Sequence, residues 1–394
     1  MGDGALERRI SRELDSLRER AQFRSLEMPD PGASINLSSN DYLGLASDPR
    51  LKRAVGEAVA RAERVGSIGS RLLSGNASEW EDVEAEFADF AGTEAALYFG
   101  SGYLANTGLL SCLLTRGDTV FSDALNHASL IDGIRLSGAA KVIYPHRNLE
   151  FLDRALRDSA DHDGARVIVT ESVFSMEGDI APIAALLALA RKYDAALIID
   201  EAHATGVWGP EGRGIVADLG GERGVLAIIH TCGKALASAG AFVCGGRALR
   251  DYLVNRARTF IFSTAMPPYM AGQIRAALAM ARAAETERTH LRAISAGLRE
   301  QLAASRLTCG TSSTQIVPVI LGSNEAALHV ASELRRSGFA AKAIRPPTVP
   351  PETARIRISL TSKIALEDIR RLSAAIAAAR NSLPQTMPTS VVHA

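Results

Sequence analysis

The sequence is poor in lysine and cysteine, and each shortage excludes a class of protein. Of the 44 basic residues only six are lysines, and 44 acidic residues bring the net charge to zero. Without a block of Lys or Arg, we expect no general nucleic-acid-binding surface. The four cysteines form no C-x-x-C pair and have no histidine at metal-ligand spacing. We therefore expect reduced thiols, no metal site and a cytoplasmic protein.

Long apolar runs are also missing. No segment approaches the length of a membrane-spanning helix, and the charged N-terminus has no apolar signal region. We therefore expect no membrane association. Apolar residues make up 47% of the 394 residues and charged residues 22%, as in globular proteins, and the length allows two or three domains or subdomains.

Three common active-site motifs are absent. Asp200-Glu-Ala-His203 resembles the Walker B box of an ATPase, but Gly233-Lys234 is followed by Ala and lacks the earlier glycine of the phosphate-binding loop. Gly100-Ser-Gly102 lacks the third glycine of a dinucleotide fingerprint. No G-x-S-x-G occurs, so an α/β-hydrolase would have no nucleophile. These absences exclude three large enzyme classes.

The middle of the chain alternates between short apolar strands and helical segments. Strands that are apolar throughout and are joined by helices indicate a mostly parallel sheet with helices on both faces. The expected strands are 95–99, 119–122, 141–144, 166–170, 196–199, 225–230 and 241–244.

The two ends of the chain have other patterns. Residues 3–28 have helical spacing, and a glycine-rich segment, Gly66–Asn76, follows a helix and is open to a turn-only interpretation. One long helix is expected over 269–304, followed by strand (315–321), helix (325–337), strand (340–345), strand (355–360) and helix (366–379). We expect an N-terminal arm with a short strand (1–45), a large domain (46–285) and a smaller C-terminal α/β domain (286–394) that is disordered from about residue 382.

Polar residues follow the expected strands at their carboxyl ends, where parallel sheets carry their chemistry. They are Gly102, His127, Glu171, Ser175, Asp200, His203, Thr231 and Lys234.

Lys234 has no charged neighbour and follows a core strand. Such a lysine either extends to the surface or lies in a pocket, where desolvation lowers its pKa and makes it a nucleophile. This stretch alone favours the surface. His127 and His203 taken singly also fit ordinary core histidines. Together with an aspartate and a lysine at the ends of the strands of one sheet, they favour a functional site.

Three features of this set would each bind a different part of one ligand. Asp200 ends the most apolar strand, where a carboxylate is costly unless it meets a cation. Gly102 and Tyr103 open a helix whose N–H groups suit a phosphate. Lys234 can form a Schiff base with an aldehyde. A protonated pyridine nitrogen, a phosphate and an aldehyde together describe pyridoxal 5′-phosphate (PLP).

Seven segments, in this order, resemble the α-oxoamine synthases, a family of fold type I PLP enzymes. The likeness covers nearly the full length of the chain and implies an α/β, aspartate-aminotransferase-like transferase with a mostly parallel central sheet. The segments are Ser38–Leu45, Gly100–Asn106, Asn126–Ser129, Thr170–Asp179, Asp200–Gly206, Thr231–Ala235 and Ser263–Pro268.

The resemblance implies that PLP is the cofactor and assigns catalytic roles to three residues. Lys234 would hold PLP, Asp200 would pair with the pyridine nitrogen, and His127 would stack on the ring and assist the acyl transfer. A homodimer with shared sites is implied as well. The other cofactor contacts are expected at Gly102, Tyr103, Glu171, Ser175, His203 and Thr231, and from the other subunit at Thr264.

The substrates follow from the same resemblance. Arg357 would bind the amino-acid carboxylate in a bidentate way, and Arg24, Asn40, Thr348 and His127 fall at substrate-contacting positions. The segment 343–357 is similar to the branch that condenses L-alanine with a pimeloyl thioester of CoA or acyl-carrier protein. A member using glycine or serine with another acyl-CoA remains an alternative. A silent PLP-fold binding protein is disfavoured because the catalytic residues are present.

Overall fold

The computed structural model describes residues 4–26, 35–159 and 163–383, and the chain forms two compact units. The N-terminal arm belongs to the same unit as the C-terminal part, although the two are far apart in sequence. The larger unit comprises residues 41–175 and 180–289, and the smaller unit comprises residues 1–40, 176–179 and 290–394.

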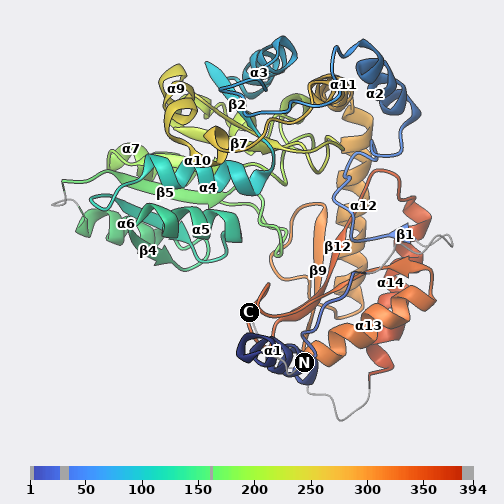
Figure 1. Cartoon of the computed structure of the whole chain (residues 1–394). Coiled ribbons are helices and arrows are strands. Elements are labelled where there is room, and N and C mark those ends of the chain that lie inside the picture. Colours follow the sequence, from blue (N-terminus) through green and yellow to red (C-terminus); the bar gives the residue numbers. More distant parts are fainter. Residues whose placement is uncertain (1–3, 27–34, 160–162, 384–394) are drawn as a thin grey trace. The chain divides into compact units, whose positions relative to one another are not determined.

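The larger unit is built on a seven-stranded sheet with the strand order β2-β8-β7-β6-β5-β3-β4 (Figure 1). β8 alone is reversed in direction and pairs antiparallel with both β2 and β7, whereas the other pairs are parallel, so the predicted, mostly parallel sheet is confirmed. The strands are β2 (Ala95–Phe99), β3 (Thr119–Asp123), β4 (Ala140–Tyr144), β5 (Arg166–Glu171), β6 (Ala196–Asp200), β7 (Ala227–Thr231) and β8 (Ala241–Gly245).

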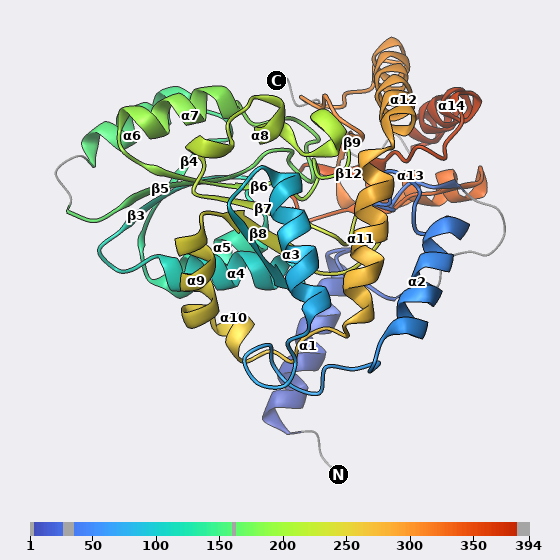
Figure 2. The same cartoon turned by 90° about the horizontal axis from the view of Figure 1, so that it is seen from above.

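Helices cover both faces of this sheet. Figure 2 shows α6 and α7 on one side of the parallel strands and α4, α5 and α9 on the other. The helices of the larger unit are α2 (Pro49–Arg61), α3 (Ser78–Ala91), α4 (Gly102–Leu113), α5 (Ala128–Ser137), α6 (Leu149–Asp158), α7 (Ile183–Lys192), α8 (Ile215–Asp218), α9 (Arg247–Arg256), α10 (Arg258–Ile261) and α11 (Tyr269–Arg282), with short 3-10 turns at Pro210–Gly212 and Glu222–Gly224.

Alternation along the strands places the core on both faces, because successive side chains point to opposite sides. Leu97 and Phe99 of β2 join the cluster that packs against α4. Tyr98, between them, stacks instead on Trp80 of α3 at a ring-centroid distance of 4.3 Å. A sheet that is apolar on both faces therefore leaves its strand ends as the place for polar side chains.

The smaller unit has its own antiparallel sheet, in the order β11-β12-β9, and a short parallel pair, β1 with β10. Helix α13 packs on β12 and against α14, and α12 (Glu285–Ala304) continues into this unit from the larger one. The other elements are α1 (Ala5–Glu19), β1 (Ile35–Asn36), β9 (Ile316–Gly322), α13 (Asn324–Arg336), β10 (Phe339–Ala340), β11 (Ala343–Ile344), β12 (Ala354–Ser359) and α14 (Leu366–Asn381).

Three predicted elements are wrong in detail. The N-terminal helix ends at Glu19, and the strand expected over 340–345 is two short strands, of which β10 pairs with β1 and β11 with β12. The long helix expected over 269–304 is interrupted between Arg282 and Glu285. There the buried guanidinium of Arg288 donates to the carbonyl oxygens of Ala281 at 2.5 Å and of Arg282 at 3.1 Å, which satisfies the last turn of α11. The predicted disordered tail lies almost wholly outside the described residues.

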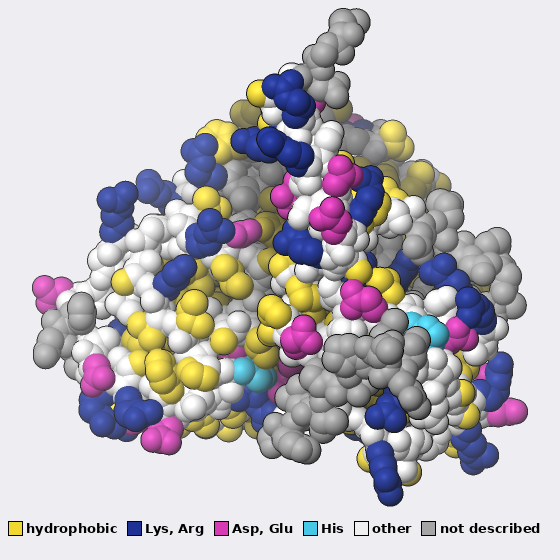
Figure 3. Space-filling view, turned by 90° about the horizontal axis from the view of Figure 1, so that it is seen from below, with side chains coloured by type: hydrophobic (Ala, Val, Ile, Leu, Met, Phe, Trp, Pro, Cys, Tyr) yellow, Lys and Arg dark blue, Asp and Glu magenta, His cyan; other side chains and the backbone are white. Residues whose placement is uncertain are grey.

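The surface carries charges of both signs. Figure 3 shows Lys and Arg side chains interspersed with Asp and Glu on one face, in keeping with the zero net charge. Within the described ranges, no helix has the length and apolar character needed to cross a bilayer. All four cysteines are free thiols, as predicted, and Cys232 and Cys244 are buried.

Candidate active site

Three adjacent parallel strands end in polar residues at one edge of the large sheet. Glu171 ends β5, Asp200 ends β6 and Thr231 ends β7, and the register sets Glu171 beside Asp200. All three side chains are buried. The prediction that polar residues meet at the carboxyl edge of this sheet is therefore confirmed for these strands.

Lys234 lies in the loop that joins β7 to β8. The loop is closed by hydrogen bonds from Cys232 N to Gly240 O at 2.9 Å and from Ser238 N to Cys232 O at 2.9 Å. Gly240 is at φ +82°, where an added Cβ would lie 2.1 Å from the Tyr98 hydroxyl, so this turn requires glycine. The lysine is half-buried and its Nζ lies 2.8 Å from Nε2 of His203. This contact favours the pocket interpretation over an amine that extends to the surface.

His203 contacts a polar group at each ring nitrogen. Its Nδ1 lies 2.6 Å from the hydroxyl of Tyr42, which is fully buried. An ammonium can only donate, so a protonated Lys234 gives its hydrogen to Nε2, and Nδ1–H then donates to the Tyr42 oxygen. Tyr42 was not predicted as a site residue, although it stands inside the segment Ser38–Leu45 that carried the resemblance.

Asp200 is a buried carboxylate held by neutral donors. It accepts hydrogen bonds from Nδ2 of Asn106 at 2.7 Å and from the backbone N–H of Ala202 at 2.9 Å. Among the described residues no Lys, Arg or His forms a salt bridge with Asp200. A buried carboxylate of this kind fits a ligand that brings its own cation, such as the protonated nitrogen of a pyridine ring.

The start of α4 fits a phosphate. Ser101 caps the helix by accepting a hydrogen bond from Leu104 N at 3.1 Å, and the backbone N–H groups of Gly102 and Tyr103 belong to the first turn, which has no acceptors within the helix. A Cβ placed on Gly102 would lie 3.6 Å from Oγ1 of Thr231. The helix start and this hydroxyl are thus close enough to bind one anion together.

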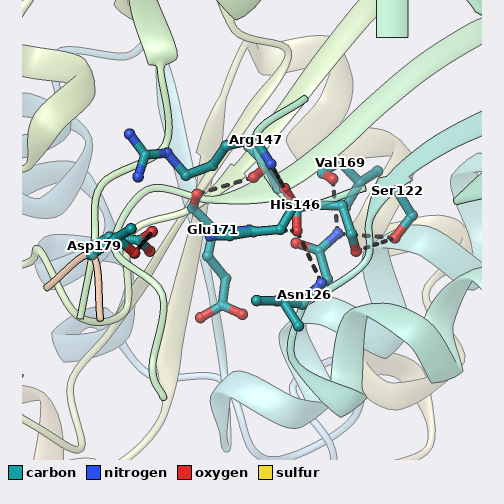
Figure 4. Close-up of polar contacts among 11 residues, drawn as sticks. Ser122, Asn126, His146, Arg147, Val169, Glu171 and Asp179 are labelled. Carbon is teal, nitrogen blue, oxygen red and sulfur yellow. Dashed lines mark hydrogen bonds and ion pairs between the residues drawn. The ribbon is translucent and has the colours of Figure 1, made fainter. Parts of the chain in front are cut away.

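His127 caps α5 and is presented by a fixed loop. Asn126 donates from Nδ2 to Ser122 Oγ at 2.9 Å and to Val169 O at 2.8 Å, which ties the loop to β3 and β5 (Figure 4). Desolvation lowers the pKa of the His127 imidazole below its ordinary value; Asp200 opposes this shift and Lys234 reinforces it. The lowered pKa favours the neutral imidazole of His127 at neutral pH.

The other predicted cofactor-binding residues differ in burial and in the groups they contact. Ser175 is half-buried in the loop after β5. Tyr103 meets His127 edge to face at a centroid distance of 6.4 Å, and its hydroxyl donates to Asp132. Thr264 is exposed and pairs through an isolated β-bridge with Ser70, in the glycine-rich segment. That segment therefore does more than form a turn.

The predicted substrate residues form two contacts within the smaller unit. Arg357, buried on β12, donates from both terminal nitrogens to Asn40 Oδ1 at 3.2 Å and from one of them to Ser359 Oγ at 2.6 Å. Arg24 donates to Thr348 Oγ1 at 3.3 Å. The structure thus groups Asn40 with Arg357, and Arg24 with Thr348.

Glu201, next to Asp200, is a buried carboxyl group with a raised pKa at the same edge of the sheet. It is fully buried and accepts hydrogen bonds from Ser172 Oγ at 2.6 Å, Val216 N at 2.8 Å and Ile215 N at 3.2 Å. Burial outweighs these bonds and raises the pKa of Glu201 from 4.5 to about 7. Because the folded state holds this proton more tightly than the unfolded state, the group destabilises the fold as pH rises from 4.5 to 7.

We expect the free energy of unfolding to fall across this pH range by up to roughly 3 kcal/mol because of Glu201. Glu201→Gln should remove that part of the pH dependence, whatever its effect on absolute stability. Urea unfolding of both proteins between pH 4.5 and 7 measures the two slopes. The exposed Glu150→Gln serves as the control. Equal slopes for the native protein and Glu201→Gln would contradict the assignment.

A family model described as aminotransferase class I and II matches residues 33–376. The chain belongs to this family, which confirms the predicted fold class. The structure is similar to the serine palmitoyltransferase of S. paucimobilis with a bound PLP–myriocin aldimine, with a TM-score of 0.88 and 29% identity, covering 96% of this chain and 99% of that one.

The more specific likeness is to 8-amino-7-oxononanoate synthases. The enzyme of that name from Herminiimonas arsenicoxydans is 42% identical over 386 residues, covering 94% of this chain and 99% of the relative. The one from Aromatoleum aromaticum is 44% identical over 371 residues, covering 92% and 95%. A solved 8-amino-7-oxononanoate synthase from Francisella tularensis has a TM-score of 0.75 and 29% identity, covering 88% and 97%. The resemblance inferred from the sequence segments is thereby confirmed.

Proposed function

We propose that the protein condenses L-alanine with a pimeloyl thioester of CoA or acyl-carrier protein. The reaction releases the free thiol and CO₂ and forms 8-amino-7-oxononanoate. Membership of the aminotransferase family and the PLP-bound neighbours confirm that the protein is a PLP-dependent transferase. Its relatives named 8-amino-7-oxononanoate synthase support a role in biotin synthesis. We also keep the prediction of a cytoplasmic protein.

One observation carries the proposal: the Lys234 amine lies 2.8 Å from His203, a residue of the loop that follows Asp200, whose buried carboxylate ends β6. Bound PLP would supply an electron sink for charge that develops on the amino-acid Cα. Lys234 would hold the cofactor, Asp200 would keep its pyridine nitrogen protonated, and Gly102, Tyr103 and Thr231 would bind its phosphate. Glu171, Ser175 and His203 would contact the rest of the ring.

The protein's own groups would then move the protons. With the amino acid bound, the Lys234 amine would act as the base that takes the proton from Cα. Arg357 would hold the amino-acid carboxylate with its planar, bidentate guanidinium. His127 would contact the acyl carbonyl, and Arg24, Asn40 and Thr348 would complete the substrate contacts.

A homodimer completes this proposal. Large apolar side chains are exposed near Thr264: Ile68 is 85% exposed, Leu73 83% and Phe262 70%. The β-bridge between Ser70 and Thr264 brings these two segments together. A second copy of the chain that covers this patch would also bring Thr264 to its neighbour's phosphate site.

A second candidate function uses serine with a long acyl-CoA. The high TM-score of 0.88 to serine palmitoyltransferase favours it. The 42–44% identity to 8-amino-7-oxononanoate synthases, against 29% to the palmitoyltransferase, favours alanine and the pimeloyl group.

Mass analysis of the products decides between the two reactions. The holoenzyme is incubated with alanine, glycine or serine, each paired with pimeloyl-CoA or palmitoyl-CoA. We expect 8-amino-7-oxononanoate from alanine and pimeloyl-CoA to be the dominant product. Dominance of a serine–palmitoyl product, or of any glycine product, would contradict the proposed substrates.

A further inference from the structure

A buried amide connects Asp200 to the helix that carries His127. Asn106, on α4, donates one hydrogen of Nδ2 to Asp200 Oδ2 at 2.7 Å and the other to Ser129 Oγ at 2.9 Å. The orientation of the amide is determined, because the reverse would set its oxygen against the carboxylate oxygen. Asn106 and Ser129 are each 1% exposed, so water does not compete for these bonds.

The direction of each hydrogen bond follows from this starting point. Ser129 Oγ accepts from Asn106, so its own hydrogen is available to the other neighbour, Nδ1 of His127, at 2.7 Å. The backbone N–H of Ser129 also points to Nδ1, at 3.2 Å. A backbone N–H can only donate. Nδ1 is therefore an acceptor and carries no proton.

We propose that Asn106 and Ser129 are positioning residues that link Asp200 to His127 and hold His127 as the neutral tautomer protonated at Nε2. Protonating Nδ1 would set its N–H against the backbone N–H of Ser129, so that bond would be lost and the Ser129 hydroxyl would have to turn its hydrogen away from the ring. The relevance of this tautomer to the reaction rests on the proposed function.

The consequence is a defined role for His127. Its Nδ1 edge is turned to the buried Ser129, whereas the side chain as a whole is exposed. The exposed edge is then an N–H donor, suited to polarising an acyl carbonyl and unsuited to taking a proton from carbon. Asp200 and Lys234 act on the imidazole through their charges and the ring of Tyr103 contacts its edge; desolvation, reinforced by Lys234, lowers the pKa of His127.

Nitrogen NMR of the holoenzyme tests the tautomer directly, without reference to turnover. The protein is labelled with ¹⁵N-histidine, and His127 is assigned among the eight histidines by its loss in His127→Gln. At neutral pH we expect an unprotonated Nδ1 and a protonated Nε2. A protonated Nδ1, or an imidazolium with both nitrogens protonated, would overturn the proposal even if the predicted product forms. If the predicted product does not form, the nitrogen signals still report the tautomer of His127. The tautomer proposal and the proposed function can therefore be refuted independently.

Three variants test the link itself. Ser129→Ala should lower kcat about 3–10-fold and Asn106→Ala roughly 10–100-fold, with PLP still bound and with the His127 nitrogen signals shifted towards a mixture of tautomers. Ser129→Thr should restore the signals. Ser137→Ala removes a hydroxyl of the same helix that donates to Ile134 O at 2.7 Å and accepts from Ala139 N at 3.1 Å, away from His127, and it should change neither quantity. If the His127 nitrogen signals of Ser129→Ala match those of Ser137→Ala, the proposed link is wrong. If a variant does not fold, the spectrum of the native protein still decides the tautomer.

Discussion

Replacing Lys234 with alanine is expected to abolish turnover, by at least about 10³-fold, together with the visible absorbance of the lysine-bound cofactor. The structure gives the reason. The Lys234 amine lies 2.8 Å from Nε2 of His203 and is carried by the closed turn between β7 and β8. Alanine removes both the covalent holder of PLP and the base for the Cα proton.

Lys192→Ala is the matched control, because its amine is exposed and pairs with Asp153 on the surface. It should retain the spectrum and the activity. An unchanged absorbance spectrum for Lys234→Ala would refute the assignment of the cofactor-holding residue.

The Asp200→Asn protein should fold and bind PLP but lose most of its rate, by about 10³-fold or more. Asparagine has the same shape and can still accept the hydrogen bond that Asn106 now gives to Asp200. It carries no charge, so it cannot keep a pyridine nitrogen protonated at neutral pH. The loss should therefore appear in kcat, with the denaturation midpoint close to that of the native protein.

Asp251→Asn changes an exposed aspartate of α9 in the same way and should behave as the native protein. Near-normal turnover in Asp200→Asn would show that the charge of this carboxylate does not serve the reaction. The electron-sink account would then be wrong.

Much of the large unit could be predicted because its strands are short and apolar throughout. Such runs indicate a buried parallel sheet, and the polar residue that ends each run marks the site. Asp200 and Lys234 were found in this way. The predicted strand boundaries differ from those in the structure by at most two residues. The reversed direction of β8 was not predicted, because it depends on pairing between strands, which the sequence pattern does not contain.

What the sequence did not predict depends on contacts between distant segments. Asn106 and Ser129 look like ordinary helix residues, and their role follows only from the packing of α4 beside α5 and β6. The interruption between α11 and α12 is similar, because it depends on the buried guanidinium of Arg288 at the last carbonyls of α11. Tyr42, Asn106 and Ser129 lie inside the segments that carry the family resemblance, and that membership is the one sequence signal that marks them.

Borohydride reduction of the holoenzyme followed by peptide mass analysis tests the central claim most directly. Reduction fixes PLP covalently to the amine that holds it, and the protein offers six lysines. We predict one modified peptide, with the added mass on Lys234. A modification on any other lysine, or none, would contradict the account of this site.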